Sequence, residues 1–487
     1  MEMKMENNRI ISHEELIRTI NTLCIQLDEE RRQHQEDVRR LEEQLSIALD
    51  EIARLKSIIN NNSNNSSRPP SSDQVGKKKR EKSANEYNSR HGKSKKRNVG
   101  GQICHKGKTL TKKDVEEKIA SGKCRHEIEN IGYVAGGKYV SKYVIDVKIE
   151  TVIREIRIYA DAHGKYHIPK AYYSDVTYGT KVKALAAMLY SEGVMSNDRI
   201  ASFLNMGTEG TMDLSESGVY GFCSQFGALS AEQAVLIEKH MMKAPVVCTD
   251  ATTVRVDGKQ SYVRNFSTED SVVYYPLQSK SIETLQAVDF AQKFEGVLEH
   301  DHETALYHFG TGHGECNVHI MRYLRKNTEE CSNPWSEDMI SLLAEMNRVR
   351  KERIEQGETR FAPQEILSFE KRYYTLIEEG RKQNKTTKYA SAREKELALL
   401  NRLEKYGDNH LLFLHRFDVP FDNNMSERDL RKVKNRQKMS GGFRKISGQQ
   451  MYCSIMSVVE TAKRRGMCIL DTIEQILSGS SVVFQPV

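Results

Sequence analysis

The sequence predicts a protein of the α+β class with several domains. Its 487 residues exceed what one simple hydrophobic core holds together, so roughly two to four domains are expected. Long stretches carry apolar residues at helical spacing, whereas two shorter regions have the strand-like patterns of alternating or short continuous apolar residues. We therefore expect a mixed sheet combined with helices and an N-terminal coiled coil.

The first region, residues 1–60, is predicted to be a coiled coil. One helix is expected over about 12–59, with charged residues on the faces that the apolar seam leaves free. The seam comprises Leu16, Ile20, Leu23, Leu27, Val38, Leu41, Leu45, Ala48, Ile52, Leu55 and Ile59. This spacing favours self-association into a homo-oligomer. The alternative is a long amphipathic helix packed on its own protein.

Residues 61–100 are predicted to be a disordered basic linker. The run from Asn60 to Ser72 is almost entirely Asn, Ser and Pro, so it offers little apolar surface to bury. Clustered bases follow, and on a flexible arm they would neutralise DNA phosphates. The bases assigned to DNA contact are Lys77, Lys78, Lys79, Arg80, Lys95, Lys96 and Arg97.

The next two regions are predicted to be small domains. Residues 101–172 alternate apolar and polar side chains within about 130–160, which indicates a small antiparallel sheet. Residues 173–243 are helical in pattern. The segments 198–206 and 215–226 flank a short turn, an arrangement compatible with a DNA-binding helix-turn-helix but equally with an ordinary helical bundle.

Residues 244–445 are predicted to form the central domain. Strand-like runs at about 246–250, 261–266 and 271–277 precede a helix near 281–292 and a further run that ends at Asp301. This order fits a mixed α/β sheet of the ribonuclease-H-like type. A charged helical stretch follows and indicates a helical insertion at about 317–410. Residues 446–487 are helical again.

Three acids in this domain are candidates for one site. Asp250 and Asp301 each end an apolar run, and Glu427 lies on a later helix rich in bases. Hard divalent cations such as Mg²⁺ take carboxylate oxygens, and two-metal phosphoryl transfer needs such a cluster. We therefore predict Asp250, Asp301 and Glu427 as catalytic and metal-binding residues. Taken singly, each would more often be a turn residue or part of a surface ion pair.

The helix that carries Glu427 has the composition of a phosphate-binding surface. Asp422 is expected to cap it, and Glu427 then lies one turn in. Lys432 belongs to the same group of bases. The residues on this helix and at the start of the predicted insertion that we assign to DNA contact are His319, Arg322, Arg428, Arg431, Lys434 and Arg436.

Other candidate sites have weaker patterns. Cys316 and His319 are three residues apart and could share zinc, but without a second pair we expect Cys316 to be packed and His319 to hydrogen-bond or face DNA. Trp335 is assigned to the core, the alternative being a ring that stacks on an extruded base. A zinc group could also be imagined from Cys124, His126, His163 and His167, although their spacing is poor.

The bulk composition sets the class of protein. Lys and Arg exceed Asp and Glu by a net charge of +7, and nine cysteines are scattered without a C-x-x-C pair. This cysteine usage argues against a disulfide framework and for a reducing compartment. No apolar run approaches the roughly 18 residues of a membrane helix, and the start has no secretory pattern. A cytoplasmic, nucleoid-associated location is expected, with no membrane partner.

Several motifs together resemble the transposases of the bacterial insertion sequence 66 family. Asn64 to Asp73 is similar to the family's Asn-Ser-Ser-(Lys/Arg)-Pro-Pro-Ser-Ser-Asp segment, and Gly100 to Gly107 to its Gly-Gly-Gln-Pro-Gly-His-Lys-Gly. Glu299-His-Asp-His-Glu-Thr304, the pair Cys316 and His319, and Asp422-Asn-Asn-Met-Ser-Glu-Arg428 complete the resemblance, which covers nearly the whole chain.

The resemblance implies a DDE transposase with a ribonuclease-H-like catalytic core that uses Mg²⁺ or Mn²⁺ at Asp250, Asp301 and Glu427. It implies cleavage at the terminal inverted repeats of an insertion sequence, followed by attack of the freed 3′-hydroxyl on target DNA. Relatives of this kind often work beside accessory proteins of the same element. The alternatives are a catalytically silent DNA-binding protein derived from a transposase and a structure-specific nuclease on the same fold.

The sequence departs from the family in two places. The family usually carries a zinc-finger-like module with paired cysteines, whereas here Cys124 has no second cysteine nearby and Asp161 to His167 replaces the second pair. We therefore regard residues 101–172 as a degenerate form of the module and do not expect zinc there. In addition, Asp250 is followed by Ala251, where relatives commonly have Glu.

Overall fold

The computed structural model divides the chain into two compact units. The larger comprises residues 1–77, 187–194 and 223–487, and the smaller comprises residues 78–186 and 195–222. The structure describes residues 13–61, 65, 110–122, 124–131, 135–138, 140–147 and 149–480. Apart from Asn61 and Asn65, the predicted linker with its seven assigned bases lies outside the described residues, as does the Gly100–Gly107 motif.

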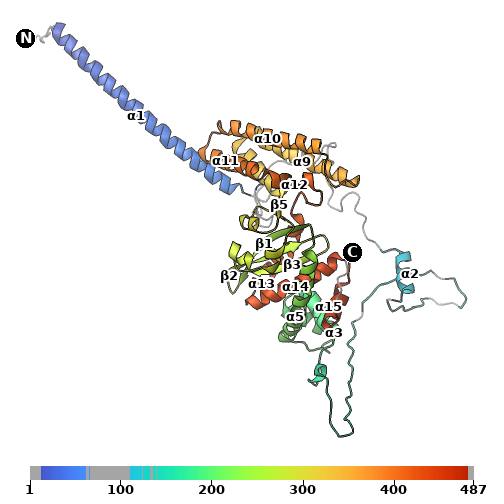
Figure 1. Ribbon diagram of the computed structural model, residues 1–487. Coiled ribbons are helices and arrows are strands. Elements are labelled where there is room, and N and C mark those ends of the chain that lie inside the picture. Colours follow the sequence, from blue (N-terminus) through green and yellow to red (C-terminus); the bar gives the residue numbers. More distant parts are fainter. Residues whose placement is uncertain are drawn as a thin grey trace, which may run out of the picture. The chain divides into compact units, whose positions relative to one another are not determined.

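A five-stranded mixed sheet organises the larger unit (Figure 1). Its order is β3-β2-β1-β4-β5, in which β1, β2 and β3 are antiparallel while β4 pairs in parallel with β1 and β5 in parallel with β4. The strands are β1 (Val246–Val256), β2 (Lys259–Ser267), β3 (Val272–Leu277), β4 (Val297–His300) and β5 (Gly312–Glu315).

The first strand is longer than the sequence predicts. The run that was expected to end at Asp250 continues to Val256, where Asp257 and Gly258 adopt φ of 51° and 72°. Two successive residues with positive φ suit the tight turn of a hairpin, so the chain reverses there and returns as β2. Asp250 therefore lies within β1 and not at its end, because its antiparallel pairing with β2 continues beyond it.

Helices from the C-terminal part of the chain pack against the sheet. Helix α13 (Asn424–Ser440) contacts β1 and β2, and α14 (Ile446–Arg464) contacts β3 and α15 (Ile469–Leu477). The buried face of α14 includes Tyr452 and Met456, which explains why this helix adheres to the sheet. The helix predicted near 281–292 is present as two short ones, α6 (Ile282–Gln286) and α7 (Asp289–Lys293).

The stretch between β5 and α13 is helical, in agreement with the predicted insertion. It packs around a core that includes Met339, Leu343 and Tyr373. Trp335 is fully buried in this core, so its assignment to the core is confirmed. The helices are α8 (Asn317–Cys331), α9 (Pro334–Glu355), α10 (Pro363–Asn384), α11 (Ala390–Lys405) and α12 (Gly407–His415).

The N-terminal part is one long helix, α1 (His13–Ile59). Its C-terminal end is tied to α11, because Ala390 N donates to Asp50 Oδ1 (2.9 Å) and Lys395 Nζ donates to Ser57 Oγ (3.0 Å). The apolar seam along the helix is exposed, with Leu41 and Leu45 each 60% accessible. This exposure is consistent with a surface for a second helix, and the coiled coil stays a prediction.

The smaller unit differs from the sheet that the sequence predicts there. The described residues between 124 and 172 contain one isolated bridge, Ala160–Tyr166, in place of the antiparallel sheet. Val144 and Ile153 are 94% and 88% exposed, so the alternating apolar side chains are not covered by a second layer. A few strands gain stability only by burying one face, which explains why the alternation alone does not produce a sheet.

Helices account for most of the remaining structure. In the smaller unit they include α2 (Lys112–Ala120) and the short η2 (Lys170–Tyr172). The stretch predicted to be helical, 173–243, contains α3 (Thr180–Ser191), α4 (Asn197–Gly207) and α5 (Glu216–Met241). None of the helices in the described residues is both long and apolar enough to span a membrane.

Candidate active site

Asp250 lies on β1, and Asp301 directly follows β4, the parallel neighbour of β1. The pairing of β1 with β4 places Cys248 opposite Glu299. Asp250 and Asp301 each lie two residues after these paired residues. The two carboxylates therefore share one edge of the parallel part of the sheet.

The proximity of the two aspartates is visible in the ionisation of Asp250. Burial raises the pKa of Asp250 to about 7, and repulsion from Asp301 adds to the rise, whereas Lys280 and Arg264 act in the opposite direction. A hydrogen bond from Ala251 N to Asp250 Oδ1 (2.6 Å) also favours the ionised form. Two carboxylates that repel each other bind a proton or a cation more readily than an isolated carboxylate does.

The start of α13 is tied to the same edge of the sheet. Asn423 Nδ2 donates to Thr249 O (2.8 Å), and Asn423 N donates to Cys316 Sγ (3.2 Å). Cys316 N in turn donates to His300 O (2.9 Å), one residue before Asp301. Glu427, in the first turn of α13, is thus brought to the region where β1 and β4 carry their aspartates.

His319 and Arg322 lie beside Glu427, and His319 is also influenced by the charge of Asp301. His319 Nε2 lies 3.6 Å from Glu427 Oε1, and Arg322 Nη1 lies 4.0 Å from the same oxygen and 3.1 Å from His319 Nε2. Burial lowers the pKa of His319, and Arg322 lowers it further, while Asp301 and Glu427 both raise it. His319 therefore lies in the electrostatic field of both carboxylates.

The capping of α13 differs from the prediction. The N-cap residue is Asn423, whose side chain bonds Thr249 O and not its own helix. Asp422 Oδ1 accepts a hydrogen bond from Asn424 N (3.1 Å), so Asp422 still satisfies one free N–H at the helix start. Asn423 does not cap the helix with its side chain because its carboxamide donates to the Thr249 carbonyl of β1.

The donor set of the three acids fits a hard divalent cation in part. Glu427 Oε1 is buried and has no hydrogen-bond partner within the described residues, although His319 and Arg322 lie at ion-pair distance from it. The mutual repulsion of Asp250 and Asp301 would be relieved by a cation. As the side chains stand, however, no three His, Cys, Asp or Glu of the described residues are arranged to hold a metal ion.

The zinc alternatives have a different environment. Cys316 is buried at the N-cap of α8, and burial raises the pKa of its thiol. Its sulfur accepts from Asn423 N, which supports the packing role that the sequence favours. In the smaller unit the side chains of Cys124, His126, His163 and His167 are all exposed.

The bases of α13 fall into two groups. Arg428, Arg431 and Lys434 are all exposed, on the part of the helix that is not packed on the sheet. Lys432 instead forms ion pairs with Glu192 and Glu460, so this amine is already paired within the protein. Arg436 lies over the ring of Tyr190, with its Cζ 4.2 Å from the ring centroid.

Two polar groups beside the acids were missed by the sequence analysis. Arg264 is fully buried, donates to Thr249 Oγ1 (3.0 Å) and pairs with Glu303, which also accepts from Lys280 Nζ (3.1 Å). Glu303 follows Asp301 by two residues, and this acidic cluster was the available signal. An arginine within the buried strand β2 was a second signal.

The other missed group surrounds Glu315 at the end of β5. This buried carboxylate accepts hydrogen bonds from His302 Nδ1 (2.9 Å), Arg402 Nη2 (2.8 Å) and His410 Nε2 (3.1 Å). His302 directly follows Asp301 and has a positive φ of 67°. Glu315 therefore links the turn after β4 to α11 and α12, a long-range contact that no local pattern reveals.

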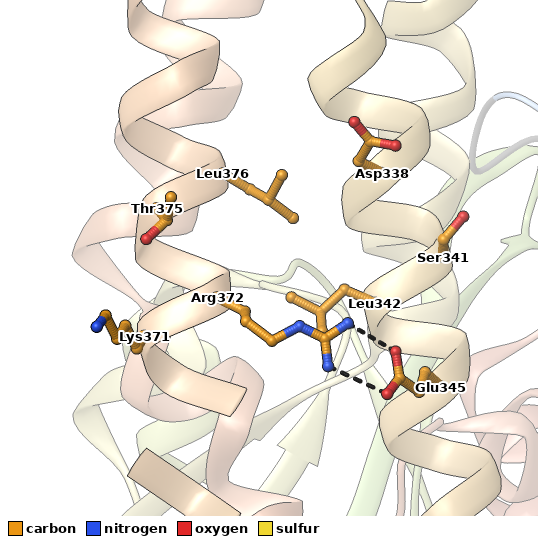
Figure 2. Close-up of a pocket in the computed structure, with 8 residues that line it drawn as sticks. All are labelled: Asp338, Ser341, Leu342, Glu345, Lys371, Arg372, Thr375 and Leu376. Carbon is orange, nitrogen blue, oxygen red and sulfur yellow. Dashed lines mark hydrogen bonds and ion pairs between the residues drawn. The ribbon is translucent and has the colours of Figure 1, made fainter. Parts of the chain in front are cut away.

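A groove on the helical insertion has a different character from the acid cluster. It lies between α9 and α10, and a two-pronged ion pair of Arg372 with Glu345 (2.7 and 3.1 Å) crosses it (Figure 2). These side chains are largely exposed, and such pairs add about 0–1 kcal/mol. None of the sequence-predicted site residues lines this groove.

Comparison with known proteins places the central part of the chain in a family. A family model described as "Transposase IS66 family" matches residues 177–451, more than half of the chain. A second model, described as "Family of unknown function (DUF6444)", matches residues 6–111. A search of curated proteins gave no match.

Proposed function

The chain belongs to the IS66 family of transposases, and from that premise we propose that it binds the terminal inverted repeats of an insertion sequence and catalyses metal-dependent DNA cleavage and strand transfer. The observation that carries the proposal is the arrangement of the acids. Asp250 lies on β1 and Asp301 directly follows β4, each two residues beyond the last residues paired between these two strands, Cys248 and Glu299. Glu427 Oε1 accepts no hydrogen bond within the described residues and lies beside His319, whose pKa responds to Asp301.

Residues 244–445 are proposed to be a ribonuclease-H-like core of the DDE type. Three antiparallel strands followed by two parallel ones, with the acids on β1, directly after β4 and on α13, support this proposal. The helices α8 to α12 are then the insertion between the second and third acids.

Asp250, Asp301 and Glu427 would hold Mg²⁺ or Mn²⁺. Such a cation supplies activation of the attacking oxygen and stabilisation of the leaving oxygen in an in-line displacement. The protein's own residues orient the reaction. Arg322 and His319 direct positive and hydrogen-bonding groups towards Glu427. The bases Arg428, Arg431 and Lys434 of the same helix are proposed to hold DNA phosphates near it.

Two further parts of the proposal concern binding. The exposed apolar seam of α1 supports self-association of the chain into a homo-oligomer. The helices of residues 173–243 are proposed as an additional DNA-binding region, since α4 and α5 follow one another in the chain with residues 208–215 between them.

A cleavage assay tests the proposed function. The full chain is incubated with Mg²⁺ and a labelled duplex carrying the element's terminal repeat, with unlabelled target DNA present. We expect nicked and joined products from the parent and at least a 100-fold loss in Asp301→Asn, because single essential groups of a catalytic cluster contribute about 10²–10⁴-fold. Asp289→Asn, which changes an exposed acid of α7, is the matched control.

The products decide between the alternatives. Sequence-selective binding without any cut would identify a silent DNA-binding protein. Cutting without joined products would identify a nuclease.

A further inference from the structure

Asn265 on β2 joins the backbone of Asp250 to the helix that carries Glu427. It lies directly opposite Asp250 in the β1–β2 pairing and is fully buried. Its Oδ1 accepts from Asp250 N (3.2 Å) and from Ser426 Oγ (2.6 Å). The carboxamide oxygen of Asn265 thus contacts the backbone of Asp250 and the side chain of Ser426, which directly precedes Glu427.

The amide nitrogen of Asn265 binds the same helix. Asn265 Nδ2 lies within hydrogen-bond distance of Ser426 O (3.2 Å), Ser267 Oγ (3.0 Å) and Asp429 Oδ2 (3.3 Å). Both ends of the carboxamide therefore hold the first turn of α13. A buried amide with all its groups engaged accepts only one orientation, which makes it a rigid spacer.

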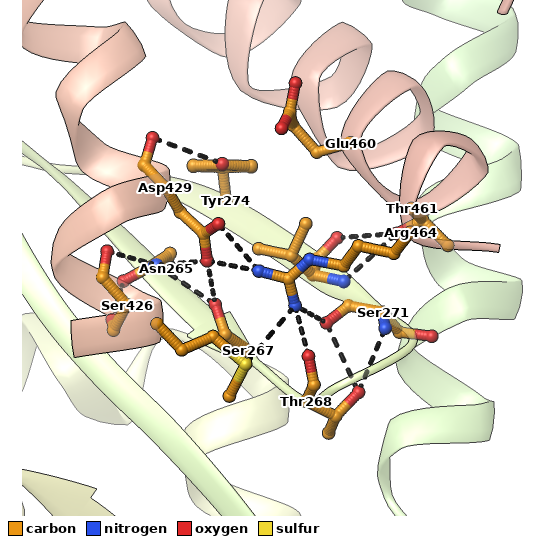
Figure 3. Close-up of polar contacts among 12 residues, drawn as sticks. Asn265, Ser267, Thr268, Ser271, Tyr274, Ser426, Asp429, Glu460, Thr461 and Arg464 are labelled. Atoms are coloured by element: carbon orange, nitrogen blue, oxygen red, sulfur yellow. Dashed lines mark hydrogen bonds and ion pairs between the residues drawn. The ribbon is translucent and has the colours of Figure 1, made fainter. Parts of the chain in front are cut away.

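An ion pair secures the same turn from the side of α14. Arg464 Nη2 donates to both oxygens of Asp429 (2.6 Å each), and Ser267 Oγ donates to Asp429 Oδ2 (2.6 Å). Arg464 also donates to the carbonyls of Ser271 (2.8 Å) and Thr268, at the turn between β2 and β3 (Figure 3). The guanidinium therefore connects α13 and α14 to the sheet.

The geometry of an α-helix explains why these contacts matter for Glu427. Ser426 and Asp429 are three residues apart and lie on one buried face of α13. Residues on a helix are separated by about 100° of rotation, so fixing this face fixes the direction in which Glu427 projects. Any rotation of the first turn would move the Glu427 carboxylate relative to Asp250.

We propose that Asn265 is a positioning residue that, together with the Asp429–Arg464 pair, sets the distance between Glu427 and Asp250 and thereby the affinity of the acid cluster for a divalent cation. This inference rests on the proposed function, because it takes the cluster to be a cation site. Groups that hold metal ligands in place commonly change affinity by about 10–100-fold when removed.

The test is direct binding of Mn²⁺ to the DNA-free full chain, followed by the electron paramagnetic resonance signal of free Mn²⁺. Asn265→Leu removes the polar links without adding charge, and we expect it to weaken Mn²⁺ binding about 10-fold or more. The matched control is Asn384→Leu. Asn384 is likewise a buried asparagine that donates to a carboxylate, Glu396 (3.0 Å), but it lies in the insertion away from the acids.

Ser426→Ala is the milder second variant, since it removes only the hydroxyl that donates to Asn265 Oδ1. We expect about a threefold loss of Mn²⁺ affinity, the equivalent of one net hydrogen bond. This variant decides the matter if Asn265→Leu does not fold. A merely structural role predicts that Asn265→Leu and Asn384→Leu lose thermal stability alike and keep the parent's affinity for Mn²⁺.

Unchanged Mn²⁺ affinity in Ser426→Ala, or in a folded Asn265→Leu, overturns the inference, and so does a parent chain that binds no Mn²⁺. If a variant keeps the parent's Mn²⁺ affinity and the parent still cleaves and joins DNA, the proposed function stands without the inference. If the parent binds Mn²⁺ and the variants weaken it, but no DNA is cut, the inference stands and the proposed reaction fails.

Discussion

Glu396 in the helical insertion and Glu299 in the sheet are both completely removed from solvent, yet their surroundings are opposite. Glu396 accepts six hydrogen bonds from five neutral residues. The donors are Asn327, Asn333, Trp335, Asn384 and Thr387, at distances of 2.7–3.1 Å. Neither carboxyl oxygen of Glu299 has a hydrogen-bond partner within the described residues.

The ionisation of the two groups follows the donors and not the burial. Burial opposes the charge of Glu396, but the bonds from Trp335 and the asparagines outweigh it, so its pKa lies below the ordinary value. Burial raises the pKa of Glu299 well above its ordinary value, and repulsion from Asp422 and Glu315 adds to this. A buried carboxyl therefore stays ionised and stabilises its surroundings only where several hydrogen-bond donors point at it.

The largest expected effect on stability comes from removing the Glu396 carboxylate. Glu396→Leu leaves five residues without their acceptor, and each unpaired buried donor costs about 1–3 kcal/mol before relaxation. We expect the free energy of unfolding to fall by at least about 3 kcal/mol, measured by urea denaturation. A loss below about 1 kcal/mol would show that the donors find other partners.

Keeping the shape but removing the charge should have a smaller effect. Glu396→Gln presents an amide to donors, and we expect a loss of about 2 kcal/mol at pH 7. Because the folded-state pKa of Glu396 lies below its ordinary 4.5, the contribution of the carboxylate is complete above that pH and is lost as the pH falls through the folded-state pKa. The gap between parent and variant should therefore narrow below about pH 4.5. A gap that widens on acidification contradicts this assignment.

One donor tests whether the bonds to Glu396 act together. Trp335→Phe removes the Nε1 donor (2.7 Å) and little of the apolar surface. We expect a loss of about 1–2 kcal/mol, and a smaller loss when the same change is made in Glu396→Gln. Equal losses in the two backgrounds, measured in a double-mutant cycle, would mean that Trp335 contributes by packing alone.

The smallest effect is expected at Glu299. Glu299→Gln replaces a carboxyl without partners by a neutral group of the same shape, so the free energy of unfolding should change by less than about 1 kcal/mol or rise. Thermal melts of the parent and the variant at neutral pH provide the measurement. A loss as large as that of Glu396→Gln would erase the difference between the two sites.

Local sequence patterns predict some residues of the candidate site and miss others. Asp250, Asp301 and Glu427 were selected because each stands at a particular place in an apolar run or a basic helix, and all three are local features. Asn265, Asp429 and Arg464 were not selected, because nothing in their neighbouring residues distinguishes a buried polar side chain with partners from an exposed one. Asn265, for example, is 161 residues from Ser426 and 164 from Asp429 along the chain.

The same limit explains the two regions of alternating pattern. Residues 246–277 and about 130–160 both have strand-like sequences. The first is covered by α13 and α14, whereas among the described residues of the second, apolar side chains such as Val144 and Ile153 are exposed. Alternation states which side chains share a face and does not state whether another element will bury that face.

The amino-acid sequence alone indicated the long N-terminal helix, the first four strands of the central region, the helical insertion and the family to which the chain belongs, because periodicity and short motifs express these within a few turns or strands. Only the tertiary structure decided which acids lie at one edge of the sheet, which bases form ion pairs within the protein and which buried carboxyl accepts converging hydrogen bonds. Those properties depend on contacts between distant segments, and the energy of a charge or a hydrogen bond is set by the groups that surround it in space.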